Sequence, residues 1–157
     1  EALAKAQRKL RHKEKGSRNW EKQQRRIAKI HRRTANQRKD FLHKQSTEIA
    51  NRYDIVCVED LDMRAMANKS FGNGKATLDN GNGMFQNMLE YKLNDRGKYF
   101  VRIDRWYPSS QLCCHCGNRQ KLELHERVYC CPVCGAVTDR DFNSAVNILT
   151  EGMRMIA

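Results

Sequence analysis

Four cysteines in two identical pairs carry the clearest chemistry in this sequence. Cys113 and Cys116 form one Cys-x2-Cys pair, Cys131 and Cys134 form a second, and fourteen residues separate the pairs. Thiolate sulfurs at this spacing are typical of a tetrahedral zinc site. Four protein ligands leave no open position for water, so the sequence predicts a zinc ion with a structural role and no part in hydrolysis.

The residues around these pairs leave alternatives open. Gly117 and Gly135 follow the pairs, where a tight turn brings backbone amides toward a thiolate sulfur. A thioredoxin-like redox pair would occur once, at a strand–helix junction, whereas this motif occurs twice. His115 or His125 is an alternative ligand that the set does not need. Seven cysteines, clustered in pairs, argue against a disulfide framework, and the others are interpreted as small hydrophobic residues: Cys57, Cys114 and Cys130.

Two acids stand where they could hold a hard cation. Glu59 ends a short run of β-branched residues, and Asp141 begins an amphipathic pattern. Phosphodiester cleavage by two metal ions needs carboxylates that converge on Mg²⁺, which stabilises the attacking and leaving oxygens. The structural alternatives are at least as well supported by the pattern alone. Asp139 and Asp141 both suit a helix N-cap, Glu59 suits an ion pair with a basic helix, and Asp104 is a weaker candidate acid.

The elements expected to position these residues alternate between helix and strand. Charged, helix-favouring residues fill positions 1–15, and a second helix is expected from about 19 to 52, after the break at Gly16-Ser17. The first strand, at 54–58, is expected to be buried on both faces because it is a continuous apolar run. The remaining elements are expected as strands at 54–58 and 99–103, a flexible glycine-rich loop at 68–83, a helix at 84–97, the metal module at 108–137 and a final helix at 141–152.

The positive charge is concentrated in the first third of the chain. The net charge is +12, and residues 1–52 contain 17 Lys or Arg against 5 Asp or Glu, whereas the remainder contains 13 of each. This asymmetry favours a polyanion partner, because neutralised phosphates release their counterions. A solvated helix face is the alternative. The candidate nucleic-acid contacts are Arg25, Arg26, Arg32, Arg33, Lys39 and Arg140.

The overall composition excludes some classes of protein. No run of eighteen apolar residues occurs, and no signal-peptide pattern precedes the first charged segment. We therefore expect a cytoplasmic protein without a membrane partner. The length of 157 residues suits one domain with a small appended module.

Several segments in combination resemble the TnpB family of transposon-encoded, RNA-guided DNA endonucleases, which are related to the type V CRISPR effectors. These segments are Val-Cys-Val-Glu-Asp-Leu at 56–61, Tyr-Pro-Ser-Ser-Gln-Leu-Cys at 107–113, the two Cys-x2-Cys-Gly units, and Asp-Arg-Asp-Phe-Asn-Ser-Ala-Val-Asn-Ile at 139–148. With the basic segment at 38–44, the resemblance extends over nearly the whole chain.

The resemblance implies an α/β fold: an RNase H-like (RuvC-type) nuclease core with an inserted zinc ribbon. The implied boundaries are 1–107 for part of the core, 108–137 for the ribbon and 138–157 for the last helix of the core. Glu59 and Asp141 fall on the second and third catalytic acids, with Mg²⁺ as their cofactor. Zn²⁺ falls on the four paired cysteines, and the implied partners are DNA and a guide RNA.

The family's first catalytic aspartate precedes the long basic helix, at a point before Glu1. The nuclease core is therefore expected to be incomplete at its N-terminus, and the chain alone is expected to be inactive. The resemblance also implies a prokaryotic protein that associates with the nucleoid. The alternative function is a nucleic-acid-binding fragment or RNA-guided regulator without nuclease activity.

Overall fold

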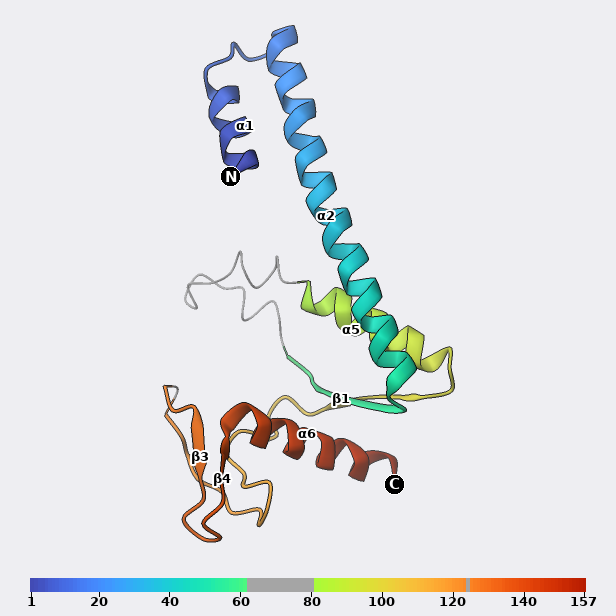
Figure 1. Cartoon of the computed structure of the whole chain (residues 1–157), viewed down its shortest axis with the longest axis vertical. Coiled ribbons are helices and arrows are strands. Elements are labelled where there is room, and N and C mark those ends of the chain that lie inside the picture. The colour runs from blue at the N-terminus through green and yellow to red at the C-terminus, as the bar shows by residue number, and fades with distance from the viewer. Residues whose placement is uncertain (62–80, 124) are drawn as a thin grey trace. The chain divides into compact units, whose positions relative to one another are not determined.

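A computed structural model of the chain describes residues 1–61, 81–123 and 125–157 (Figure 1). It divides into two compact units, residues 1–48 and 49–157. Most of the loop expected at 68–83 lies outside the described residues. In the described part of the chain, no helix is long and apolar enough to cross a membrane. The domain boundaries that the resemblance implies stay predictions.

The first unit consists of two helices, α1 (Ala2–Arg11) and most of α2 (Arg18–Arg52). Ser17 precedes α2, and its hydroxyl accepts the backbone N–H of Trp20 at 3.2 Å. The buried amide of Gln23 donates to the carbonyl oxygen of Ala6 at 2.8 Å and thereby ties α2 to α1. The expected second helix is confirmed, whereas the first ends four residues earlier than expected.

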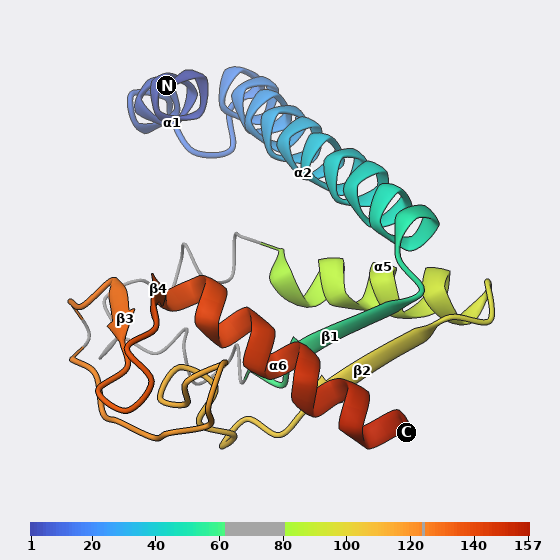
Figure 2. The same cartoon turned by 60° about the horizontal axis from the view of Figure 1, so that its bottom comes forward.

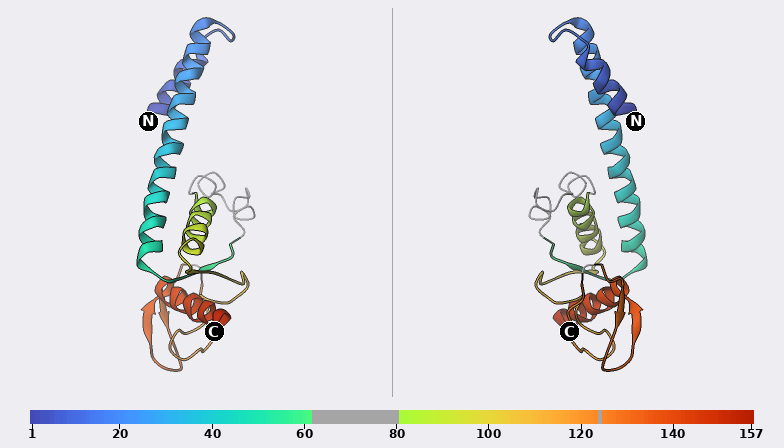
Figure 3. Two further views of the ribbon diagram at one scale, coloured as in Figure 1. Left: turned by 90° about the vertical axis from the view of Figure 1, so that its right-hand side faces the viewer. Right: turned by 90° about the vertical axis from the view of Figure 1, so that its left-hand side faces the viewer.

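The second unit is built on two parallel strands. β1 (Ile55–Glu59) pairs with β2 (Tyr99–Ile103), and Glu59 lies opposite Ile103 in the register. α5 (Asn82–Asn94) and α6 (Arg140–Ile156) cover opposite faces of this pair (Figures 1 and 3). Both faces of β1 are therefore covered, as expected, but its residues are half-buried and not fully buried. The reason is that, among the described residues, β2 is its sole neighbouring strand.

Each face of the strand pair has its own packing. On the α5 side, Leu89 and Leu93 form a cluster with Ala50, against which Val56 and Phe100 pack. On the α6 side, the helix approaches β1 at a residue without a side chain. A Cβ atom added to Gly152 would lie 2.3 Å from the sulfur of Cys57, so only glycine permits this close approach. The result is a mixed α/β unit of three layers.

The cysteine module extends from the end of β2 to the start of α6 (Figure 2). β3 (Val128–Cys130) and β4 (Val137–Asp139) form an antiparallel hairpin, and Leu112 forms an isolated bridge with Arg119. The fully buried Tyr129 lies between the two cysteine pairs, and its hydroxyl is 3.1 Å from the carbonyl oxygens of Gln111 and Asn118. This tyrosine, with Cys113 and Cys131, forms the small core of the module.

Candidate functional site

The two cysteine pairs adopt the same turn. The N–H of Gly117 donates to the carbonyl of Cys113 at 2.9 Å, and the N–H of Gly135 donates to that of Cys131 at 3.0 Å. Both glycines have a φ of +73°, in the left-handed region where other residues are strained. The glycines are therefore needed for the turn geometry, as the sequence predicted.

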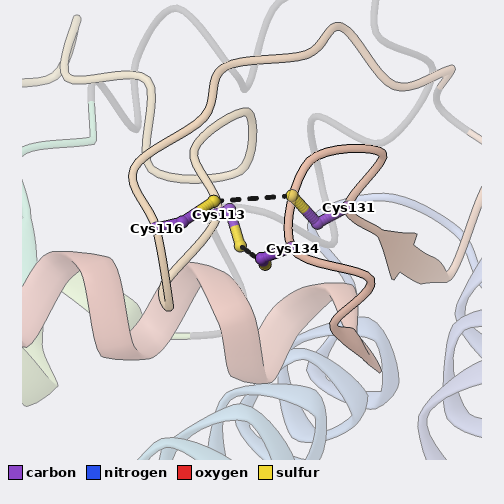
Figure 4. A group of neighbouring side chains, drawn as sticks. All are labelled: Cys113, Cys116, Cys131 and Cys134. Atoms are coloured by element: carbon purple, nitrogen blue, oxygen red, sulfur yellow. Dashed lines mark hydrogen bonds between the residues drawn. The ribbon is translucent and has the colours of Figure 1, made fainter.

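These turns bring the four sulfurs together (Figure 4). All four lie within 4.8 Å of one another, and the Sγ–Sγ distances are 3.7 Å for Cys113–Cys134 and 3.6 Å for Cys116–Cys131. Zinc–sulfur bonds of about 2.3 Å in a tetrahedron place the sulfurs ~3.8 Å apart. A disulfide would require about 2.05 Å. The donor set therefore fits a zinc ion, and neither His115 nor His125 belongs to the cluster.

Backbone amides favour the metal-binding form of one cysteine. The N–H groups of Cys134 and Val133 lower the pKa of Cys131 to about 6, although desolvation of the thiolate opposes this shift. Because metals bind the thiolate and not the thiol, this environment prepares the sulfur for coordination.

Two asparagines on α6 fasten the first cysteine turn to this helix. Asn143 is fully buried; its side-chain oxygen accepts the N–H of Cys114 at 2.9 Å, and its amide donates to the carbonyl of Leu112 at 2.6 Å. The amide of Asn147 donates to the carbonyls of Leu112 and Ser109, both at 2.8 Å. The sequence did not predict this clamp, because both asparagines meet carbonyl oxygens that lie far from α6 in the sequence.

The structure separates the roles of the two aspartates at the start of α6. The carboxylate of Asp139 is the N-cap and accepts the N–H groups of Asp141 and Phe142, both at 2.9 Å. Asp141 occupies the first turn, and its side chain is exposed. Asp141 is therefore not the N-cap of α6. A carboxylate in this turn is favoured by the helix dipole.

Glu59 lies at the carboxyl end of β1 on the side that α6 covers. Side chains alternate along a strand, so Glu59 shares a face with Cys57, which packs against Gly152 of α6. Partial burial desolvates the Glu59 carboxylate and raises its pKa. None of the ion pairs among the described residues involves Glu59, whereas its neighbour Asp60 pairs with Arg105 at 2.6 Å. The alternative of an ion pair between Glu59 and a basic helix is therefore not found among the described residues, and the partner of Asp60 lies in the turn that follows β2.

Glu59 and Asp141 lie on the same side of the strands without forming a complete metal site. Asp141 precedes Gly152 by eleven residues, which corresponds to about 16 Å along the axis of α6. Among the described residues, the four cysteines are the one group of three or more His, Cys, Asp or Glu side chains suited to a metal ion. The carboxylate of Asp104 instead accepts a hydrogen bond from the backbone N–H of Trp106 at 2.6 Å, within a turn.

The predicted basic contacts lie on exposed positions of α2. Arg25 and Arg26 line a hollow of about 910 Å³ in the first unit, while Arg32, Arg33 and Lys39 are exposed farther along the helix. Glu21 is the acid of this hollow and lies 3.7 Å from Arg25. Four more cations line it and were not among the predicted contacts: Lys13, Arg18, Lys22 and Lys29.

Arg140 has backbone contacts within the cysteine module. Its Nη1 donates to the carbonyl oxygens of Glu123 at 2.9 Å and Glu126 at 3.1 Å. These bonds give the guanidinium a structural role at the junction with α6. Its contact with nucleic acid stays a prediction.

Comparisons with known families match two separate parts of the chain. Residues 83–148 match the family described as "Cas12f1-like, TNB domain", and residues 1–70 match the OrfB family of IS605, described as "Probable transposase". A solved structure of a Cas12f1–sgRNA–target DNA complex shares the fold, with a TM-score of 0.58 and 22% identity over 78% of this chain and 36% of that chain.

Individual relatives span nearly the whole chain. A Streptomyces pristinaespiralis protein named "Putative RNA-guided DNA endonuclease" is 46% identical over 96% of this chain and 37% of its own length. InsQ of Escherichia coli, with the same description, is 33% identical over 99% of this chain and 42% of its own length. TnpB-like protein L79 of Acanthamoeba polyphaga mimivirus is 29% identical over 88% of this chain and 27% of its own length. The chain thus spans less than half the length of each relative.

Proposed function

Because this chain belongs to the TnpB (OrfB, IS605) family, which is related to Cas12f, we propose that it forms the C-terminal part of an RNA-guided, Mg²⁺-dependent DNA endonuclease. The names of the relatives support this function. The observation that carries it is that Glu59 faces the layer of α6, the helix whose first turn contains Asp141. Within this proposal, the α/β unit is part of an RNase H-like (RuvC-type) core.

Glu59 and Asp141 are the proposed catalytic carboxylates and Mg²⁺ ligands, and a further acid comes from outside this chain. Burial that raises the pKa of Glu59 makes its carboxylate unusually dependent on a neighbouring cation. Bound Mg²⁺ would supply the positive charge that stabilises the attacking and leaving oxygens at the scissile phosphate. The exposed position of Asp141 in the first helical turn leaves its carboxylate accessible to the same ion and to substrate.

The cysteine module has a positioning role in this proposal. Its four sulfurs would complete the coordination of a structural zinc ion, and Asn143 and Asn147 connect the first cysteine turn to α6. The clamp starts two residues after Asp141. Order in the module therefore restrains the helical turn that presents the carboxylate.

The cationic hollow at the start of α2 suits contacts to phosphate. Lys and Arg side chains there would hold the guide–target duplex or the displaced strand through the backbone without reading bases. Such contacts predict binding that weakens steeply as salt rises.

The test uses the intact parent protein with its guide RNA and a target plasmid. Glu59→Gln and Asp141→Asn should each reduce Mg²⁺-dependent cleavage by more than about 10²-fold, because each removes a charge from the reacting centre. Target binding should stay within about twofold. Matched controls are Asp60→Asn, which alters the acid paired with Arg105, and Asp139→Asn, which keeps a capping side chain. Retained cleavage, or an equal loss of binding, in the first two variants would refute the assignment.

A second candidate function is nucleic-acid binding without cleavage by this chain alone. It is favoured by the lack of a three-acid cluster among the described residues. A Mg²⁺-dependent cleavage assay of the 157-residue chain, run beside a salt-dependent binding assay, separates the two functions. Binding without cleavage by the chain, together with cleavage by the parent, is the expected result.

A further inference from the structure

Trp106 is an aromatic side chain held in the open by an ordered turn. It is 84% exposed, more than any other large apolar side chain among the described residues. The backbone N–H of Trp106 donates to the carboxylate of Asp104 at 2.6 Å, and the backbone N–H of Tyr107 donates to the Asp104 carbonyl at 3.1 Å. The backbone at Trp106 is therefore fixed while the indole remains in solvent.

The indole borders a surface hollow of about 490 Å³ at the carboxyl ends of the parallel strands. Strand ends in open α/β sheets are where ligands commonly bind. Ile103, the register partner of Glu59, and Asp60, which follows Glu59, both line the hollow, so it lies next to the strand end that carries the proposed catalytic acid. The other residues that line it come from the end of β2 and from α6: Arg102, Asp104, Arg105 and Met155.

The charges around this hollow are balanced. Arg105 pairs with Asp60 at 2.6 Å, and Arg102 pairs with Glu90 at 2.8 Å. A phosphate would have to compete with these carboxylates for the guanidinium groups. A flat, uncharged ring would instead stack on the indole without disrupting either ion pair.

We propose that Trp106 stacks on an unpaired base of the DNA strand to be cut and holds that strand beside Glu59. This inference rests on the proposed endonuclease function, which supplies the DNA substrate. A base face is available to the indole only in a single-stranded segment, and stacking of this kind tolerates any base. Trp106 is thus a substrate-positioning residue at the end of β2.

Intrinsic fluorescence tests the contact in the full 157-residue chain. The sequence contains two tryptophans, so Trp20→Phe leaves Trp106 as the single tryptophan reporter. A single-stranded DNA 12-mer should quench its emission. Trp106→Ala should weaken affinity for this strand roughly 5- to 100-fold, and Trp106→Phe should retain most of it, because a phenyl ring also stacks. Trp20→Ala is the matched control and should leave affinity within about threefold.

A strand of the same length without bases separates stacking from phosphate contact. Trp106→Ala should not change its affinity. Thermal unfolding of Trp106→Ala should match that of the unmodified chain, because the side chain is exposed. The inference is overturned if the 12-mer does not quench Trp106 fluorescence, or if only RNA or duplex DNA does so. It is also overturned if Trp106→Ala weakens affinity for the abasic strand as much as for the 12-mer.

The failure of this inference is distinguishable from that of the proposed function. Glu59→Gln should abolish cleavage by the parent while the quenching of Trp106 remains. If Trp106 fluorescence is quenched but the parent never cleaves DNA, the endonuclease function is refuted and the stacking site stands. The opposite outcome is cleavage that depends on Glu59, without quenching of Trp106 and without any change in Trp106→Ala at limiting substrate. That outcome would refute the stacking site alone.

Discussion

Replacing Asn143 by alanine should loosen the connection between the first cysteine turn and α6. The side chain is fully buried and satisfies two backbone groups, the N–H of Cys114 and the carbonyl of Leu112. In Asn143→Ala the N–H of Cys114 loses its partner, whereas the carbonyl of Leu112 keeps the amide of Asn147 at 2.8 Å. An unsatisfied buried group costs about 1–3 kcal/mol, and the lost packing brings the expected decrease in unfolding free energy to about 2–4 kcal/mol.

The shared carbonyl makes a double-mutant cycle informative. Asn147→Ala alone removes the amide from Ser109 but leaves the Leu112 carbonyl bonded to Asn143. With both asparagines replaced, the Leu112 carbonyl loses both donors at once. The double variant should therefore be less stable than the sum of the single changes by about 1 kcal/mol.

Urea unfolding of the zinc-loaded chain measures these changes, followed by circular dichroism and by zinc release to a dye. Thr150→Ala is the control, because its hydroxyl donates to the Val146 carbonyl on an exposed part of α6, and it should change stability by less than about 0.5 kcal/mol. Strict additivity, or a cost for Asn143→Ala as small as that of the control, would refute the clamp. In the parent, Asn143→Ala should slow cleavage while target binding persists.

Three further predictions address the packing of the second unit. Zinc chelation, or Cys116→Ser, should unfold the 108–137 module while the helical signal of α2 remains; unchanged thermal stability after verified zinc loss would contradict a structural metal. Gly152→Ala should destabilise by about 1–3 kcal/mol, since the added carbon would lie 2.3 Å from the Cys57 sulfur and overpacking outweighs a helix-propensity gain of about 1 kcal/mol. Cys57→Ala should restore part of the loss, because its own Cβ would still lie 2.9 Å away; a fully stable Gly152→Ala would argue against this packing. Burial, and then the Glu151 carboxylate, raise the pKa of Tyr107 above 10.0 against an opposing effect of Arg154, so the folded state holds this proton more tightly. Stability should fall as pH rises above 10 and fall less in Tyr107→Phe, with melting temperatures from pH 8.5 to 11 as the measurement.

Local patterns were sufficient for several features of this protein. The α2 helix and the β2 strand follow from residue periodicity, and the paired Cys-x2-Cys-Gly units predicted the clustering of four sulfurs. Motifs in combination and order were also sufficient to identify the family. In these cases the determining residues are close in sequence, or each short segment adopts its turn without help from distant residues.

Other features were decided by contacts between distant segments. Asn143 meets Leu112 across 31 positions, and Asn147 meets Ser109 across 38, so no local pattern could show the clamp. The sequence made Asp139 and Asp141 equivalent capping candidates, and only the geometry of the β4–α6 junction chose Asp139.

Only the tertiary structure could show that Glu59 lies on the face of the strand pair that α6 covers. It follows from the packing of Gly152 against Cys57, residues that lie 95 positions apart. Residue types thus determined which groups could bind a metal or a phosphate. Packing between β1, β2 and α6 decided which of them share a face, because that choice depends on which surfaces the helix and strands bury against each other.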